Sequence, residues 1–230
     1  MKRSIFFCIF LSFLFLIESN SLLCSEKPAS LEVVTGLMGR GKTETLIDAA
    51  KEASVRSPKN VLAFFHHFDL ERQNDETRKG LHSRNGKFFP AKSVKNGNEI
   101  VKTYELFKKT ESKKPYLVVI DEGHFFDETL IKAVEKITQQ NTDVLVGGLL
   151  YTFLKEKFKT VDQLLSLAEN HTRLKPGKCV KCETKEAKWM QRIIIENGQE
   201  KPASRKDPIV LVGKEDCYRR HCEDCHTIPD

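Results

Sequence analysis

The stretch Leu31-Glu32-Val33-Val34-Thr35-Gly36-Leu37-Met38-Gly39-Arg40-Gly41-Lys42-Thr43 decides the fold. It opens as a β-branched run typical of a strand, and from Gly36 onward it fits the phosphate-loop pattern G-x-x-x-x-G-K-[ST]. Residues 43–53 follow with Leu46, Ile47 and Ala50 on one helical face. Strand, loop and helix in this order are what the motif requires, because backbone N–H groups and the helix N-terminus bind phosphate together.

The chemistry expected of this loop follows from its residue types. The glycines let backbone N–H groups turn inward around phosphate oxygens, Lys42 reaches the β- and γ-phosphates, and the Thr43 hydroxyl is a ligand for Mg²⁺. A chance glycine-lysine loop is the alternative, and the flanking strand and helix argue against it. We therefore expect ATP to bind through the whole loop: Gly36, Leu37, Met38, Gly39, Arg40, Gly41, Lys42 and Thr43.

Apolar strands alternate with helical segments along the chain, which predicts an α/β fold. The further strands are expected at residues 61–65, 116–120 and 144–146. Helices are expected at residues 104–108, 128–140 and 161–168, and surface loops at residues 66–98. The predicted architecture is a P-loop NTPase-like, doubly wound parallel sheet flanked by helices, followed by a small C-terminal zinc-binding lobe.

Length and composition limit the domain count and the class of protein. The chain has 230 residues, 40% hydrophobic and 30% charged, which excludes wholesale disorder and a polytopic membrane protein. We expect a P-loop nucleotide-binding domain over residues 26–175 and a small C-terminal lobe over residues 176–230. The net charge of +6 is spread along the chain, which suits phosphorylated ligands and gives no reason to expect a nucleic-acid partner.

The N-terminus has the pattern of a leader. Lys2 and Arg3 precede the apolar run of residues 5–17, as in the n-region and h-region of a secretory signal, although no clear small-x-small cleavage site follows. The run is too short for a comfortable membrane span. We treat residues 1–25 as a signal or leader segment outside the fold, and export, membrane attachment and a wrongly assigned start all stay open.

Two carboxylates follow the apolar run that ends at Ile120. Asp121 stands where the end of a buried strand would face the phosphate loop, so it is expected to hold Mg²⁺ together with Thr43. Glu122 is then free to act as a catalytic general base. The alternative is a surface Asp-Glu pair that opens a helix, where acidic residues favour the helix dipole.

Four of the seven cysteines form two C-x-x-C pairs. Cys179, Cys182, Cys222 and Cys225 have the number and the pair spacing of a closed structural Zn²⁺ site. Two disulfides are the alternative, because a secretory signal would bring the chain to an oxidising compartment. Nearby histidines are interpreted as ordinary surface residues, because four sulfurs already satisfy the metal: His171, His221 and His226.

These pieces together resemble the thymidine kinase family of the type with a P-loop core and a C-terminal zinc lobe. The match covers about residues 31–226. Residues 120–126 are similar to its I-D-E-[AG]-Q-F-F signature, with His124 in place of Gln, and residues 148–169 resemble the next block. Residues 210–225 resemble the closing strand and lid of the family.

The resemblance implies ATP:nucleoside 5′-phosphotransferase activity on thymidine or a related pyrimidine deoxynucleoside, for dTMP salvage and DNA synthesis. It makes Glu122 the general base for the 5′-hydroxyl and extends the ATP site to Asp121, Glu122, Gly123 and His124. It further implies a homotetramer, with ATP, Mg²⁺ and structural Zn²⁺ as cofactors, and a cytoplasmic location. The nucleoside site implied by the resemblance comprises Phe125, Leu149, Phe153, Met190, Ile209, Val210, Leu211, Val212, Gly213 and Tyr218.

Several positions depart from the family pattern. The Asp-x-Arg that follows the second strand is not cleanly present, so either Arg72 or Arg78 is the phosphate-stabilising arginine. Met190 stands where the family usually has Thr near the thymine methyl, Leu150 replaces a usual Asp, and Lys214 replaces a usual Gly. These changes bear on base selectivity more than on phosphoryl transfer.

Two other functions are compatible with parts of the sequence. A P-loop ATPase coupled to a partner would turn over nucleotide without nucleoside. A catalytically inactive, zinc-stapled binding module would not need the intact set Lys42, Thr43, Asp121 and Glu122. A panel of nucleosides with labelled ATP separates these alternatives from a kinase.

Overall fold

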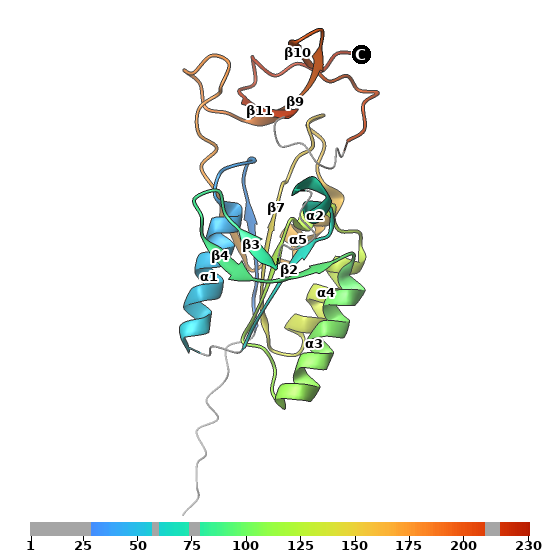
Figure 1. Cartoon of the computed structure of the whole chain (residues 1–230). Coiled ribbons are helices and arrows are strands. Elements are labelled where there is room, and N and C mark those ends of the chain that lie inside the picture. The colour runs from blue at the N-terminus through green and yellow to red at the C-terminus, as the bar shows by residue number, and fades with distance from the viewer. Residues whose placement is uncertain (1–28, 57–59, 74–78, 210–216) are drawn as a thin grey trace, which may run out of the picture.

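The computed structural model describes residues 29–56, 60–73, 79–209 and 217–230. They form a layered α/β core and a smaller lobe built from the C-terminal strands (Figure 1). None of the helices among these residues has the length and apolar character that a membrane span needs. The leader predicted at residues 1–25 lies outside the described residues.

A six-stranded parallel sheet is the centre of the core, in the order β5-β2-β6-β7-β1-β8. The carboxyl ends of β6, β7 and β1 lie side by side, at the edge where parallel sheets bind ligands. The prediction of a parallel, helix-flanked sheet is therefore confirmed. The strands of this sheet are β1 (Leu31–Thr35), β2 (Val61–His66), β5 (Lys92–Val94), β6 (Leu117–Asp121), β7 (Asp143–Gly148) and β8 (Asn170–Arg173).

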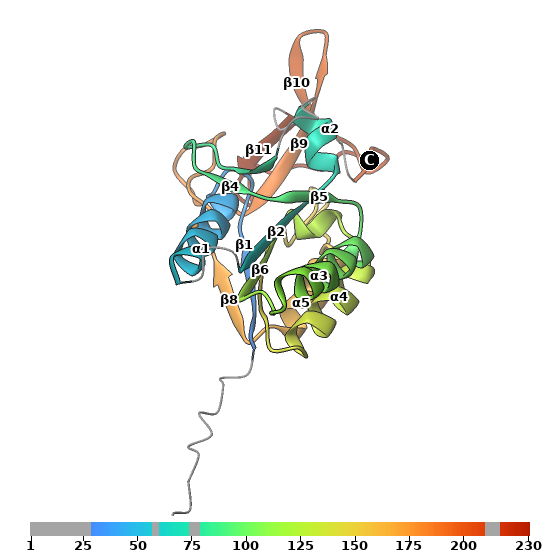
Figure 2. The same cartoon turned by 60° about the horizontal axis from the view of Figure 1, so that its bottom comes forward.

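Helices cover both faces of this sheet (Figure 2). On one face lies α1 (Lys42–Arg56), whose apolar side chains form a core with β1, β2 and β6. On the other face lie α3 (Gly97–Glu111), α4 (Thr129–Thr138) and α5 (Lys159–Leu167), which share a second core with the same sheet. Burial of apolar surface on both faces holds the sheet edge, and with it the phosphate loop, in a fixed position.

The C-terminal lobe is a three-stranded antiparallel sheet. Its central strand β9 (Trp189–Glu196) pairs with β10 (Gln199–Pro202) on one side and with β11 (Tyr218–His221) on the other. The closing strand predicted by the resemblance includes residues 210–212, which lie outside the described residues.

The expectation of surface loops for residues 66–98 is wrong. This segment contains α2 (Phe68–Gln73), β3 (Gly80–His82) and β4 (Phe88–Pro90), in addition to β5. Each of these strands has three residues, which is too short to give a readable alternation of apolar and polar side chains. Strand β8 was missed for a similar reason, because its sequence Asn-His-Thr-Arg is polar and it lies at the edge of the sheet.

The helix expected at residues 104–108 is much longer, because α3 already begins at Gly97. The Asn96 side chain accepts a hydrogen bond from the Glu99 N–H at 3.2 Å and so caps the helix. Gly97 allows close packing on α4, since a Cβ at this position would overlap the backbone of Thr129. The sequence signal for the start of α3 is the capping residue Asn96, which lies among polar residues. The spacing of apolar residues alone did not reveal it.

Candidate active site

The loop between β1 and α1 is held by hydrogen bonds from the side chain of Lys42 to the backbone of the loop. Gly39 and Gly41 have φ of 67° and 93°, in the left-handed region that glycine adopts without strain. Lys42 is buried, and its Nζ donates hydrogen bonds to the carbonyls of Gly36 at 3.0 Å and Leu37 at 3.2 Å. The ammonium group is therefore held at the loop in which a phosphate would sit.

Thr43 and Asp121 meet across the edge of the sheet. The Thr43 hydroxyl donates to Asp121 Oδ2 at 2.7 Å, and the Glu122 N–H donates to Asp121 Oδ1 at 2.8 Å. Burial, and then the neighbouring charge of Glu122, raise the pKa of Asp121 to about 7. Gly147 leaves room for this carboxyl, since a Cβ there would lie 3.2 Å from Asp121 Oδ1. A hydroxyl beside a buried carboxylate fits Mg²⁺, whose charge would offset both effects that raise the pKa.

Glu122 occupies a strained position directly after β6. Its φ of 55° and ψ of 39° are left-handed, a region that a residue other than glycine rarely adopts outside functional sites. Its side chain is 14% exposed, and its Oε2 lies 3.5 Å from His124 Nδ1. The same His124 nitrogen accepts a hydrogen bond from the Leu149 N–H at 3.3 Å. The strained turn therefore places a carboxylate beside an imidazole that is itself held by the next loop.

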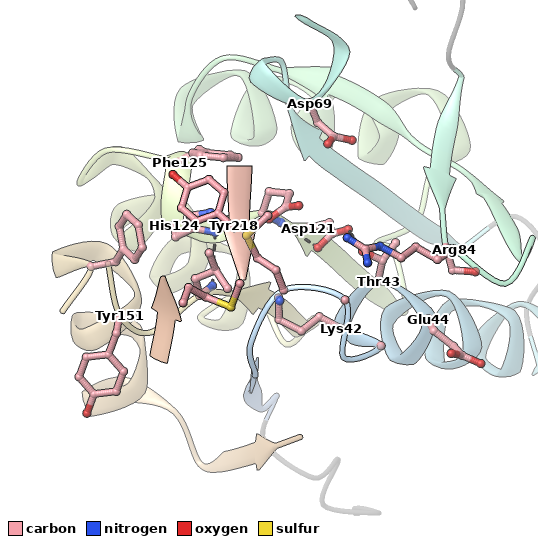
Figure 3. A pocket seen from close by; sticks show the side chains of 18 of the residues that line it. Lys42, Thr43, Glu44, Asp69, Arg84, Asp121, His124, Phe125, Tyr151 and Tyr218 are labelled. Atoms are coloured by element: carbon pink, nitrogen blue, oxygen red, sulfur yellow. Dashed lines mark hydrogen bonds and ion pairs between the residues drawn. The ribbon is translucent and has the colours of Figure 1, made fainter. Parts of the chain in front are cut away.

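These groups line one cavity of about 400 Å³ (Figure 3). Lys42, Thr43 and Asp121 lie at one end of the cavity, and Phe125 and Tyr218 lie at the other. A charged end that can bind phosphates thus continues into an aromatic end that can hold a flat ring.

Most of the residues predicted for the site line this cavity: Met38, Gly39, Gly41, Lys42, Thr43, Asp121, Glu122, His124, Phe125, Leu149, Phe153, Met190, Ile209 and Tyr218. Gly36 and Leu37 line a smaller neighbouring cavity. Arg40 turns away, since its Nε donates to the Lys175 carbonyl at 2.9 Å. Gly123 packs beneath the site, where a Cβ would lie 2.7 Å from Val146 Cγ1. The remaining predicted residues lie outside the described residues: Val210, Leu211, Val212 and Gly213.

The cavity also contains residues to which the sequence assigned no role. Arg84 reaches it from the turn between β3 and β4, and Tyr151 reaches it from the loop after β7. The buried carboxyl of Asp69 in α2 is a third such group. The choice between Arg72 and Arg78 stays a prediction, because the Arg72 side chain and the whole of Arg78 lie outside the described residues.

The two cysteine pairs come together in the lobe. The Sγ atoms of Cys179, Cys182, Cys222 and Cys225 all lie within 4.8 Å of one another. The cysteines among the described residues are free thiols, in contrast to the disulfide alternative. The pKa of Cys182 is lowered to about 6, first by a hydrogen bond from the Thr184 side chain. Four sulfurs at this spacing, one of them with thiolate character, are compatible with a tetrahedral zinc site.

The interpretation of all three nearby histidines as surface residues is wrong for two of them. His221 and His226 are buried, with 9% and 7% of their surface exposed. His226 lies directly after the last cysteine, and its backbone N–H donates to the Cys222 carbonyl at 3.1 Å. His171 is exposed, as expected, and its Nε2 contacts the Thr35 hydroxyl at 2.8 Å.

An ion-pair network binds the lobe to a wall of the cavity. Glu223 accepts hydrogen bonds from Lys155 Nζ at 2.6 Å and from Trp189 Nε1 at 2.7 Å, and Lys188 Nζ lies 3.0 Å away. These donors, Lys155 first, lower the pKa of Glu223 to about 2. Lys155 belongs to the same loop as Phe153, which lines the cavity. The position of the lobe and the shape of the aromatic end are therefore linked.

Comparison with known proteins agrees with this geometry. The family model described as "Thymidine kinase" matches residues 29–226. The thymidine kinase of Mycoplasma capricolum subsp. capricolum is 34% identical over 205 residues, which cover 89% of this chain and 92% of that protein. The thymidine kinase of Mycoplasma mycoides subsp. mycoides is 33% identical with the same coverage. That of Mesoplasma florum is 33% identical over 198 residues, or 86% of this chain and 91% of its own. The chain therefore belongs to the thymidine kinase family.

Proposed function

We propose that this kinase transfers the γ-phosphate of ATP to the 5′-hydroxyl of thymidine with Glu122 as the general base. One observation carries the proposal: a phosphate loop, two acidic residues and an aromatic pocket share a single cavity. An ATPase without a nucleoside substrate would have no use for the aromatic end of that cavity.

The charged end supplies positioning and charge neutralisation, which account for most of the catalysis in phosphoryl transfer. The loop N–H groups and Lys42 bind the phosphates of ATP. Thr43 and Asp121 are the residues that would hold Mg²⁺, which when bound neutralises charge on the transferring phosphoryl group.

Glu122 accepts the proton of the 5′-hydroxyl while that oxygen bonds to the γ-phosphorus, and ADP leaves with the electrons of the broken bond. Geometry supports this role, because the carboxylate lies in the cavity directly beside Asp121. The His124 ring lies beside this carboxylate, with its Nδ1 3.5 Å from Glu122 Oε2. The same ring is tilted by 38° against the ring of Phe125, at a centroid distance of 4.1 Å.

The aromatic end binds the pyrimidine. Phe125, Tyr218 and Met190 form its walls, and Phe153 is fixed by the Arg192 guanidinium 5.4 Å from its ring centroid. Backbone hydrogen bonds from residues 209–213 to the base edge remain part of the proposal.

The proposed setting of the enzyme follows from its substrates and its family. It acts in the cytoplasm, where ATP is abundant, to supply dTMP for DNA synthesis. The resemblance to the family further supports a homotetramer, which light scattering of the purified full chain would test.

Thymidine-dependent turnover is the direct test of the function. The full chain, given labelled ATP and a panel of nucleosides, should form labelled monophosphate with thymidine and related pyrimidine deoxynucleosides. Equal ADP formation with and without nucleoside would favour the ATPase alternative and contradict this proposal.

Met190→Thr should strengthen the preference for thymidine over deoxyuridine. Met190 is buried and lines the cavity, where its long, flexible side chain takes the place of the family's Thr near the thymine methyl. A contact of this size contributes about 1–3 kcal/mol, so the preference of the natural enzyme should be weak. The measurement is kcat/KM for both nucleosides in both proteins. An unchanged ratio would show that residue 190 does not face the methyl group.

A further inference from the structure

Two arginines from other parts of the chain approach the phosphate loop. Arg84 comes from the turn between β3 and β4, and Arg220 comes from β11 in the lobe. A Cβ at Gly39 would lie 2.5 Å from Arg84 Nη1 and 3.5 Å from Arg220 Nη1. Arg220 Nη1 also donates to the Met38 carbonyl at 3.5 Å. Two guanidinium groups thus border the middle of the loop from outside it.

Helix α1 holds Arg84 in place. The neighbouring Asn85 donates from Nδ2 to Glu44 Oε1 at 2.6 Å, and Lys87 Nζ lies 2.9 Å from the same oxygen. Because α1 starts directly at the end of the phosphate loop, these bonds fix the turn relative to the loop. Arg84 lines the cavity and points toward the end that contains Asp121 (Figure 3).

The lobe holds Arg220 in place. Arg220 lies opposite Met190 in the β9–β11 ladder, two positions before the cysteine cluster begins again at Cys222. Side chains two apart on a strand share a face, so Arg220 is on the same side of β11 as Tyr218. Tyr218 lines the aromatic end of the cavity. Strand β11 therefore reaches both the nucleoside end of the site and the phosphate loop.

The Arg84 and Arg220 guanidinium groups lie against the same glycine of the loop, Gly39, so both are placed to contact an anion bound there. The Nε of Arg220 is buried without a hydrogen-bond partner among the residues that the structure describes. A planar guanidinium matches the oxygens of a phosphate, which would satisfy the donors and neutralise both guanidinium groups.

We propose that Arg84 and Arg220 bind the terminal phosphates of the donor nucleotide from outside the phosphate loop. The zinc-binding lobe then contributes a phosphate ligand in addition to a wall of the nucleoside pocket. This inference rests on the proposed function, because it assigns residues to the phosphates of the same ATP.

Arg220→Gln in the full chain tests the inference. The Kd for ATP should rise about 10-fold or more, as expected for the loss of hydrogen bonds to a charged group. The melting temperature without ligand should stay close to that of the wild type, because the Arg220 guanidinium donates only a long hydrogen bond, 3.5 Å, to the Met38 carbonyl. Inorganic tripolyphosphate should compete with ATP less well in the variant than in the wild type. Arg84→Gln should raise the same Kd, and Arg220→Lys should restore part of the affinity.

Arg219→Gln is the matched control. Arg219 is the adjacent residue on the opposite face of β11, and it pairs with Glu200. This variant should bind ATP as the wild type does. Wild-type ATP affinity in Arg220→Gln, in a preparation whose wild type phosphorylates thymidine, would overturn the inference and leave the proposed function intact. A lower melting temperature with equal losses for ATP and thymidine would overturn it in favour of a structural role. A wild type without thymidine-dependent turnover would instead contradict the proposed function.

Discussion

Replacing Glu122 by Gln is expected to lower kcat for thymidine phosphorylation by about 10²-fold or more, because general-base catalysis contributes about 10²–10⁴-fold. The amide keeps the size of the side chain but cannot take the proton of the 5′-hydroxyl. The Kd for ATP should stay close to that of the wild type, because Lys42 and the loop N–H groups are unchanged. Steady-state kinetics and a binding titration measure the two effects.

The controls separate chemistry from folding. Gln tolerates the left-handed backbone at residue 122, where φ is 55°, about as well as Glu does, so the melting temperature should not fall. Glu128→Gln removes a carboxylate just before α4, outside the cavity, and should leave kcat unchanged. If Glu122→Gln turned over thymidine at nearly the wild-type rate, Glu122 would not be the general base.

The fold was predictable where apolar residues are continuous or regularly spaced. Strands β1 and β6 and helix α1 contribute buried apolar side chains to the two cores. Their continuous or regularly spaced apolar residues are visible in the sequence. Strands β3 and β4 pair with each other, but each has only three residues, too few for a readable alternation of apolar and polar side chains. Strand β8 is polar, and its pairing with the distant β1 is tertiary information that the local sequence does not carry.

The same distinction applies to the site. Lys42, Thr43, Asp121 and Glu122 follow directly from motifs, since each lies at the end of an element whose position the sheet dictates. Arg84 and Tyr151 have no local signature, and they enter the cavity only through the packing of two loops. The proximity of Arg220 to Gly39 likewise exists only because the lobe folds back on the core.

Zinc removal is expected to have the second large effect. The purified protein should contain about one Zn²⁺ per chain, since four thiol sulfurs lie within 4.8 Å of one another. Apparent binding free energies of structural zinc sites are about 10–16 kcal/mol, larger than the whole stability of many domains. Chelation, or the change Cys222→Ala, should therefore unfold the lobe while the parallel sheet stays folded. Hydrogen exchange would show faster exchange in β9 and β11 than in β1 and β6.

Loss of the lobe should abolish phosphorylation of thymidine without abolishing nucleotide binding. Tyr218 and Met190 would leave the aromatic end of the cavity, whereas Lys42 and Thr43 belong to the core and would remain. Arg220 would leave the phosphate loop at the same time, so the chelated wild type should bind ATP about as weakly as zinc-loaded Arg220→Gln does. ATP binding that is unchanged on chelation would separate the lobe from the phosphates. Mass spectrometry that found two disulfides and no metal would contradict the zinc site itself.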